Sequence, residues 1–188
     1  SSQVIELVKD RFSLYEQALW GAVSFYEASE QGINYSNWKK YATSLHIETT
    51  YPGINGIGII YNVKLDQLAE YYLKERIERP DYVIFPQHNQ SEYWPITYIE
   101  PELFNSKAIG LDMAFEENRY TAIKKARDTG IAQLTGPITL VQDDKKTPGF
   151  LFYAPIYKKN SSTNTIQDRQ ENIVGVSYAP FIMKKLIS

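Results

Sequence analysis

Apolar residues recur at spacings of three and four along the first 30 residues, which places them on one face of a helix. This face comprises Val4, Val8, Phe12, Tyr15, Leu19, Ala22 and Tyr26. No proline interrupts the pattern, and Gly32 follows it as a C-terminal stop. The sequence therefore predicts a helix over residues 3–29. We expect part of this long helix to project as a stalk; the alternative is a helix that lies along its own sheet throughout.

Beyond Gly32 the pattern alternates between helices and short apolar strands. Helices are predicted from Ser36 onward, over 66–78 and over 116–128, with a helical turn at Pro101. Strands are predicted at 54–63, 82–85, 93–99, 131–134, 138–142, 150–157 and 173–178. Residues 143–149 are typical of a hairpin connection, and the low-complexity stretch 158–171 is typical of a mobile surface loop.

This order of elements predicts an α+β fold. We expect a long N-terminal stalk helix in residues 1–30, followed in residues 31–188 by a mainly antiparallel sheet with flanking helices. The length of 188 residues and the apolar share of 43% suit one compact domain with a helical arm. Aromatic residues make up 14% of the chain, which suits half-buried sheet surfaces and pocket walls.

Charge and composition exclude several classes of partner. The formal net charge is −2 and the lysines are dispersed, so no basic stripe is present to bind nucleic acid. The absence of cysteine excludes disulfides and thiolate metal sites. No run of 18 apolar residues is present, and the chain begins with Ser1-Ser2 rather than Met. We therefore expect an excised fragment whose membrane segments, if it has them, lie outside this sequence.

No constellation of catalytic or metal-binding residues is evident. The two histidines, His46 and His88, lie far apart, the first among apolar residues and the second in a polar loop. A zinc site needs three or four ligands, usually with a close pair, and that spacing is missing. The acidic pair Glu116-Glu117 is explained by helix polarity. The sequence thus predicts a domain that is not an enzyme and needs no cofactor.

Asp112 is the candidate binding residue that stands out. It lies within the apolar stretch Ala108–Phe115, where a carboxylate is costly to bury unless it accepts hydrogen bonds. One interpretation is that Asp112 caps a neighbouring turn or helix. The other is that it accepts hydrogen bonds from N–H groups of a small ligand. The residues alone leave both interpretations open.

Six short motifs follow one another at close spacing along the chain. They are YPGINGI (51–57), PITYIEP (95–101), GLDM (110–113), ARDTG (126–130), LTGP (134–137) and GFLFYAPIY (149–157). Their order resembles that of the CHASE domain, the extracytoplasmic sensor module of histidine kinases and diguanylate cyclases, of which the plant cytokinin receptors are the best-known members. The resemblance covers roughly residues 15–185. It implies a PAS-like fold for residues 31–188 and a non-enzymatic sensor function.

The resemblance also implies a binding site. In cytokinin receptors the aspartate of the Leu-Asp-Met segment binds the ligand and the backbone of the leucine in Leu-Thr adds a contact; these positions match Asp112 and Leu134 here, with Thr135 following. Gly136 departs from the plant pattern, and bacterial members of the family need not bind cytokinin, so a ligand that carries an amine or ring N–H, purine-like or amine-like, is the general expectation. Further candidates for the pocket wall are Tyr98, Phe150, Phe152 and Ala154. Strand alternation puts the last three on one face of their strand.

The resulting hypothesis is an extracytoplasmic, periplasmic or extracellular sensor domain of a membrane-anchored histidine kinase or diguanylate cyclase. A small molecule in the PAS-like pocket would bias the sheet, and the stalk helix would transmit this bias toward the membrane. Two stalks would pair along the stripe from Val4 to Tyr26 to form a homodimer. The alternative is a dimerisation or protein-interaction module with a vestigial pocket and no small-molecule ligand, in which aromatic side chains fill the space beside Asp112.

Overall fold

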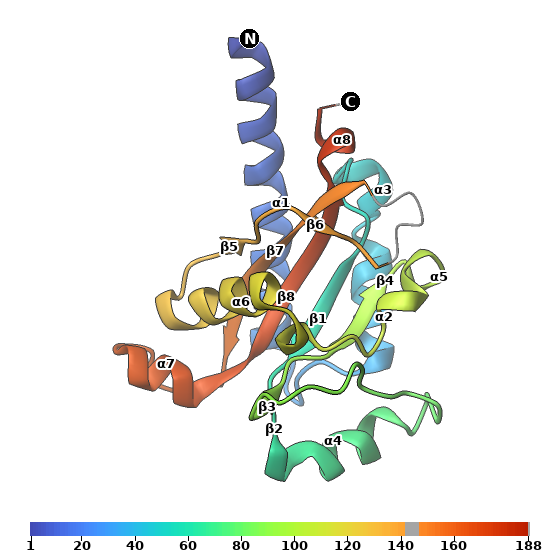
Figure 1. Ribbon diagram of the computed structural model, residues 1–188, viewed down its shortest axis with the longest axis vertical. Coiled ribbons are helices and arrows are strands. Elements are labelled where there is room, and N and C mark those ends of the chain that lie inside the picture. The colour runs from blue at the N-terminus through green and yellow to red at the C-terminus, as the bar shows by residue number, and fades with distance from the viewer. Residues whose placement is uncertain (142–146, 188) are drawn as a thin grey trace.

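The protein is built around an antiparallel sheet with helices on both faces (Figure 1). The computed structural model describes residues 1–141 and 147–187. The main sheet has the order β4-β1-β8-β7-β5, and β6 also pairs with β7. Its strands are β1 (Ile57–Tyr61), β4 (Ile96–Glu100), β5 (Gln133–Leu134), β6 (Ile138–Thr139), β7 (Pro148–Tyr157) and β8 (Ile173–Ile182). A small second sheet pairs β2 (Val63–Lys64) with β3 (Glu92–Tyr93).

The helices lie on the two faces and at the edges of the sheet. They are α1 (Ser2–Ala28), α2 (Tyr35–Ser44), α3 (Ile47–Thr50), α4 (Leu68–Glu75), α5 (Glu102–Asn105), α6 (Glu117–Thr129), α7 (Ile166–Asn172) and α8 (Met183–Leu186). Short 3-10 turns cover Leu65–Gln67, Ser106–Ala108 and Met113–Phe115. The predicted α+β class, with a long N-terminal helix and a mainly antiparallel sheet, is confirmed.

The sheet separates two apolar layers because successive side chains of a strand point to opposite faces. Along β7, Leu151 and Tyr153 belong to the layer covered by α6, which we call the α6 layer. Phe150, Phe152 and Ala154 belong to the layer covered by α1 and α2, which we call the α1 layer. The long central strands β7 and β8 contribute residues to both layers.

Helix α1 both packs on the sheet and projects beyond it. From Val8 onward its apolar stripe packs against the α1 layer, and Tyr15, Leu19 and Ala22 are fully buried. The first turns extend past the body of the molecule, and Ile5 remains 56% exposed (Figure 1). Each of the two sequence interpretations therefore describes part of the helix: a free stalk at the start, and a helix along its own sheet after it.

Local details of α6 follow the sequence pattern closely. The side chain of Glu116 caps the helix by accepting hydrogen bonds from the N–H groups of Asn118, at 2.7 Å, and Arg119, at 3.1 Å. Gly130 ends the helix in the left-handed region with φ of 71°, where glycine is favoured over other residues. The predicted helix over 116–128 is thus confirmed within a residue at each end.

Two predicted segments differ from the structure. Residues 82–85 form no strand apart from a bridge between Phe85 and Leu111, since the backbone there runs beside the 110–113 segment rather than in the main sheet. The predicted loop 158–171 ends in helix α7, which Thr165 caps by accepting from the N–H of Asp168 at 3.0 Å. Polar contacts hold helix α7 in place, so no apolar periodicity in the sequence predicted this helix. Of the predicted connection 143–149, only residues 147–149 lie within the described part.

Candidate functional site

Asp112 is fully buried and its carboxylate is already engaged within the protein. Oδ1 accepts hydrogen bonds from the backbone N–H of Trp94, at 2.7 Å, and of Ala114, at 3.0 Å. The second of these bonds caps the 3-10 turn Met113–Phe115. Oδ2 lies 2.5 Å from Nε2 of His88. Oδ1 of Asp112 therefore acts as the cap that one interpretation expected, whereas Oδ2 is bonded to the side chain of His88.

His88 reaches Asp112 as a hydrogen-bond donor. Its Nδ1 accepts from the N–H of Gln90 at 3.1 Å, so this ring nitrogen is unprotonated. The proton of a neutral imidazole then sits on Nε2 and points at Oδ2 of Asp112. This geometry places one ring N–H on the carboxylate, which is the contact that the sequence analysis expects from a ligand.

A second buried carboxylate, Glu92, shares Trp94 with Asp112, since the backbone N–H of Trp94 donates to Asp112 and its indole N–H donates to Glu92. Its Oε1 accepts from Trp94 Nε1 at 2.9 Å and from Tyr120 Oη at 3.1 Å, and its Oε2 accepts from Asn62 at 3.0 Å. Burial by itself would raise the pKa of Glu92, but these hydrogen bonds and the charge of Lys64 outweigh it and leave the pKa below its usual value. The region therefore contains two buried carboxyl groups whose oxygens accept hydrogen bonds from the protein.

The predicted wall residues lie on the other side of the sheet. Tyr98, Phe152 and Ala154 are buried in the α1 layer, and Phe150 packs against it. Asp112 instead lies between Leu111 and Met113, which belong to the α6 layer. The structure therefore does not bring these four residues to Asp112. The strand face that meets the α6 layer carries the alternate set, Leu151 and Tyr153, as the period of two requires.

Leu134 and Thr135 are the remaining two predicted site residues, and they differ from each other in exposure. Leu134 is 38% exposed and lines a shallow hollow of about 540 Å³ beside α6, together with Glu117 and Lys125. Thr135 is buried, donates its N–H to the carbonyl of Leu151 and accepts the N–H of Leu151 on Oγ1, both at 2.9 Å. Thr135 thus extends the pairing of β7 and has a structural role in this arrangement.

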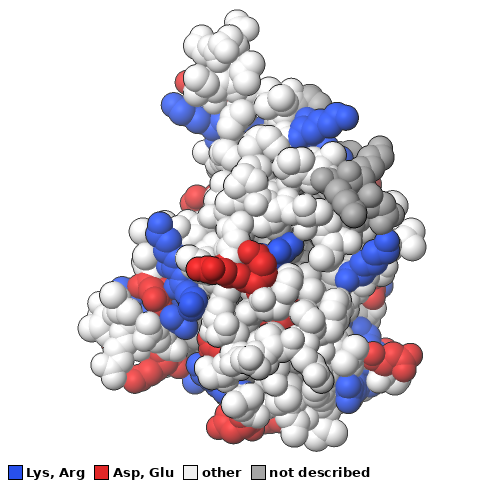
Figure 2. Space-filling view, viewed as in Figure 1, with Lys and Arg blue, Asp and Glu red and all other residues white. Residues whose placement is uncertain are grey.

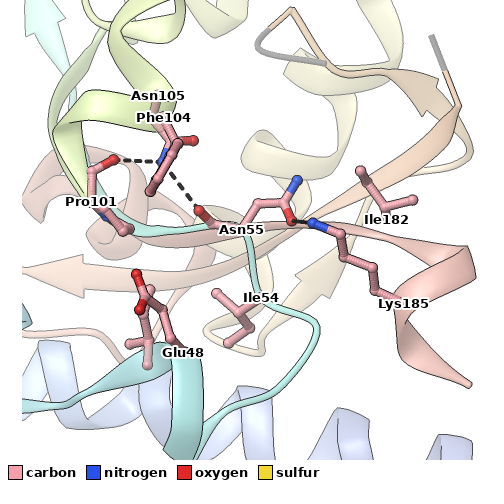
Figure 3. Close-up of a pocket in the computed structure, with 9 residues that line it drawn as sticks. Glu48, Ile54, Asn55, Pro101, Phe104, Asn105, Ile182 and Lys185 are labelled. Atoms are coloured by element: carbon pink, nitrogen blue, oxygen red, sulfur yellow. Dashed lines mark hydrogen bonds between the residues drawn. The ribbon is translucent and has the colours of Figure 1, made fainter. Parts of the chain in front are cut away.

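A cavity of about 420 Å³ lies between α3, α5 and α8 (Figure 3). Its polar groups mostly bond to one another. The Asn105 amide donates to the carbonyls of Pro101 and Asn55, at 2.7 and 3.1 Å, and Lys185 Nζ donates to Asn55 Oδ1 at 3.1 Å (Figure 3). Because these groups satisfy each other, the cavity is a junction that ties α8 to the turn before β1.

His88 is the residue of this site that sequence reasoning missed. It lies 24 positions from Asp112 in a polar loop, and nothing in the sequence pattern linked the two residues. No local motif marks the pairing, since only the folded loop brings the two together. Within residues 1–141 and 147–187, no group of three or more His, Cys, Asp or Glu side chains is placed to hold a metal ion. The same residues include no helix long and apolar enough to cross a membrane.

A family model described as CHASE domain matches residues 31–188. The chain belongs to the CHASE domain family. A curated relative of this CHASE domain is the hybrid signal transduction histidine kinase A of Dictyostelium discoideum, 23% identical over 109 residues that make up 55% of this chain. Among solved structures, an extracellular ligand binding receptor from Desulfohalobium retbaense DSM5692 is similar, with a TM-score of 0.58 at 9% identity over 97% of this chain.

These matches cover only small parts of much larger proteins. The aligned region is 5% of the Dictyostelium kinase, and this CHASE domain covers 25% of the receptor chain. At 9% identity the receptor supports the fold and carries no residue of the site. The family match is therefore the finding that bears on function, because CHASE domains are sensor modules.

Proposed function

We propose that this CHASE domain is the extracytoplasmic ligand-binding sensor of a membrane-anchored signalling protein, a histidine kinase or diguanylate cyclase. The family match over residues 31–188 carries this proposal. The kinase name of the Dictyostelium relative and the receptor fold of the solved structure support it. Nothing in the described site suggests a reaction: the buried carboxylates each accept hydrogen bonds and no nucleophile stands beside them.

The ligand site of this proposal is Asp112, with His88 as the group that the ligand replaces. A small molecule with an amine or ring N–H would donate to Oδ2, while Oδ1 keeps its two backbone donors. Exchange of one N–H donor for another leaves no buried oxygen unsatisfied, which keeps the cost of opening the site low. His88 belongs to the loop between Ile84 and β3, and its departure would make room next to the carboxylate.

The signal would leave the domain through α1 and α8. Both chain ends lie at the same end of the molecule (Figure 1). The carbonyl of Pro52 accepts hydrogen bonds from Arg11, at 2.9 Å, and Tyr15, at 2.5 Å, and Lys185 bonds Asn55 in the same turn. A shift of β8 against α1 would therefore move both terminal helices together. The membrane segments of this proposal lie outside the present chain.

Dimer formation through α1 would be confined to its first turns. The stripe from Phe12 onward contacts the sheet and is not available to a partner. Val4 and Ile5 are 46% and 56% exposed, and the tip of the helix carries little charge in Figure 2. Sedimentation of wild type and Ile5→Glu tests this: a dimer that Ile5→Glu dissociates supports the pairing, and a wild-type monomer at high concentration rejects it.

A thermal-shift screen of purines, amines, amino acids and organic acids tests the ligand site. A compound at a hundred times its dissociation constant stabilises the fold by about 2.7 kcal/mol. We expect Asp112→Asn to weaken the hit and His88→Ala to strengthen it, because His88 competes for Oδ2. His46→Asn, at an exposed left-handed position that Asn tolerates, is the control and leaves binding unchanged.

The alternative is an interaction module without a small-molecule ligand. One observation favours it: His88 and the backbone already satisfy Asp112, and Trp94 is fully buried beside it. A folded protein that responds to no compound, in wild type and in His88→Ala alike, would establish this alternative and reject the sensor proposal.

A further inference from the structure

Helix α4 lies at the end of the molecule opposite to the two chain ends (Figure 1), and a second cavity lies against it. Its volume is about 360 Å³, within the range of small-molecule sites. It lies between α4 and the adjoining ends of β1 and β8. Tyr61, Tyr71 and Glu75 form its wall, and Lys64, Lys74 and Lys158 surround it. We call it the α4 cavity. It shares no lining residue with Asp112 and the direct hydrogen-bond partners of Asp112, although Asn62 and Lys64 at its edge also contact Glu92.

Glu75 is the unusual group in this wall. It is 4% exposed, and its Oε1 accepts hydrogen bonds from Tyr98 Oη, at 2.7 Å, and from Arg79 Nη2, at 3.1 Å. Within the described part of the chain, both bonds end on the same oxygen and none reaches Oε2. Oε2 is not among the fully buried side-chain atoms that lack a partner, so it stays accessible from the cavity that Glu75 lines. A donor on a bound molecule in the cavity would supply the missing bond.

The charges around the cavity favour a guest that carries both signs. Arg79 already balances Glu75, so a purely cationic guest would add an uncompensated charge. Lys64 pairs with Glu92 at 3.6 Å, which leaves two ammonium groups (Lys74 and Lys158) and two carboxylates (Glu70 and Glu171) around the cavity. These charges balance, so a guest without net charge is favoured. A zwitterion satisfies both ends: an ammonium for Glu75 and a carboxylate for the lysines.

The aromatic wall fits the same chemistry. Lys74 Nζ already lies 5.7 Å from the ring centre of Tyr61 and donates to the carbonyl of Ile33 at 3.5 Å. An ammonium near the face of a tyrosine is attracted by the ring. Tyr61 and Tyr71 also keep their protons, because burial and then neighbouring groups, Glu75 among them, raise the pKa of each. The wall therefore stays neutral while Glu75 and the lysines supply the charges.

We propose that the α4 cavity is a second ligand site, which binds a small free amino acid. Its ammonium donates to Oε2 of Glu75, and its carboxylate lies beside Lys74 and Lys158. This site is distinct from the Asp112 site and does not depend on it. A CHASE domain with both sites binds two different small molecules, one at Asp112 beside the α6 layer and one in the α4 cavity.

Isothermal titration and thermal shift of the intact chain test the proposal. The probes are the common L-α-amino acids, β-alanine and γ-aminobutyrate. Each hit is compared with the amine and the acid of the same carbon skeleton; for γ-aminobutyrate these are n-butylamine and butyrate. We expect at least one amino acid to bind at least tenfold more tightly than either single-charge analogue. The absence of binding by every amino acid, or equal binding of the three analogues, overturns the proposal.

Variants place the binding in the cavity. Glu75→Gln and Lys74→Met should each weaken the hit at least fivefold, while Lys9→Met, an exposed lysine on α1, leaves it unchanged. Because Glu75 also holds Arg79, Glu75→Gln can fail to fold; Lys74 is exposed, so Lys74→Met remains a valid test. Unchanged affinity in Lys74→Met rejects the site. Asp112→Asn should leave this binding intact, so failure of one site is distinguished from failure of the other.

Discussion

At the scale of single residues, the site is defined by how each carboxylate oxygen is satisfied. Asp112 has backbone donors on one oxygen and His88 on the other, whereas Glu75 has both of its donors on one oxygen. The first pattern makes a carboxylate that the protein can hold closed by itself. The second leaves Oε2 of Glu75 free to accept a hydrogen bond from a ligand. The two residues thus make different demands on a ligand, although both are buried acids.

Replacing Asp112 separates its capping role from its binding role. Asp112→Ala leaves the buried N–H groups of Trp94 and Ala114 without an acceptor, and each such loss costs about 1–3 kcal/mol. Asp112→Asn keeps an acceptor oxygen for both, so we expect it to lose less than half as much. Urea unfolding of the two variants measures the difference. Equal losses would show that the charge, rather than the acceptor, holds this turn.

Gly53 shows a similar dependence on a single position. Its φ of +99° lies in the left-handed region, and a Cβ there would meet Tyr15 Oη and approach the carbonyl of Lys185 at 3.3 Å. Only glycine lets the Pro52–Asn55 turn pass between α1 and α8 at this distance. The sequence places Gly53 in the YPGINGI motif, but the reason that glycine is needed there is tertiary.

At the scale of elements, helix α1 shows how far an apolar period can be interpreted. The stripe predicted the helix and its buried face correctly, because periodicity reports which side of a helix is apolar. It did not tell what covers that side. The sheet covers Tyr15, Leu19 and Ala22, and nothing among the described residues covers Ile5 to the same extent. Helix α7 shows the converse, since Arg169 anchors it through the carbonyls of Asp128 and Thr163.

The two parts of α1 should respond differently to truncation. Leu19 is fully buried, so Leu19→Ala should destabilise the fold by about 2–5 kcal/mol through lost burial and the cavity it leaves. Ile5→Ala, at a site 56% exposed, should change stability by no more than about 0.5 kcal/mol. Urea midpoints compare the pair directly. A large effect of Ile5→Ala would indicate that the first turns are covered, by a second copy or otherwise.

At the scale of the whole molecule, the chain ends and the proposed second ligand site lie at opposite ends of the fold. The chain ends leave at one end beside the Pro52–Asn55 turn, and the α4 cavity opens at the other (Figure 1). The central strands β7 and β8 connect them. Acidic and basic side chains are interspersed over the face seen in Figure 2, so no single-sign surface dominates it. The distribution of function along the long axis suits a domain that converts binding into a movement of its terminal helices.

The tyrosine content predicts how the fold responds to alkaline pH. Burial, followed by the charge of Glu92, raises the pKa of Tyr120 to about 12, and burial raises the pKa of Tyr157 to about 12. The folded state therefore favours the neutral phenols over their ionised forms. This contribution is complete below the ordinary tyrosine value of 10.0 and is lost as pH rises through about 12. We expect stability to fall over that range.

Denaturant unfolding at a series of alkaline pH values, with phenolate absorbance as a second measurement, tests this expectation. Phenylalanine does not titrate, so Tyr120→Phe combined with Tyr157→Phe should flatten the decline. An unchanged pH dependence in the double variant would show that other groups cause the alkaline loss.

The sequence by itself determined what depends on near neighbours in the chain. Periodicity marked α1 and the strands, glycine and glutamate marked the ends of α6, and the order of short motifs identified the family. The tertiary structure alone decided which strand face meets which helix, which is why Tyr98, Phe150, Phe152 and Ala154 lie away from Asp112. It also brought His88 to Asp112 across 24 positions and left one oxygen of Glu75 open to a cavity. The physical reason is that periodicity fixes the alternation of side chains, whereas contacts between distant segments depend on how the elements pack.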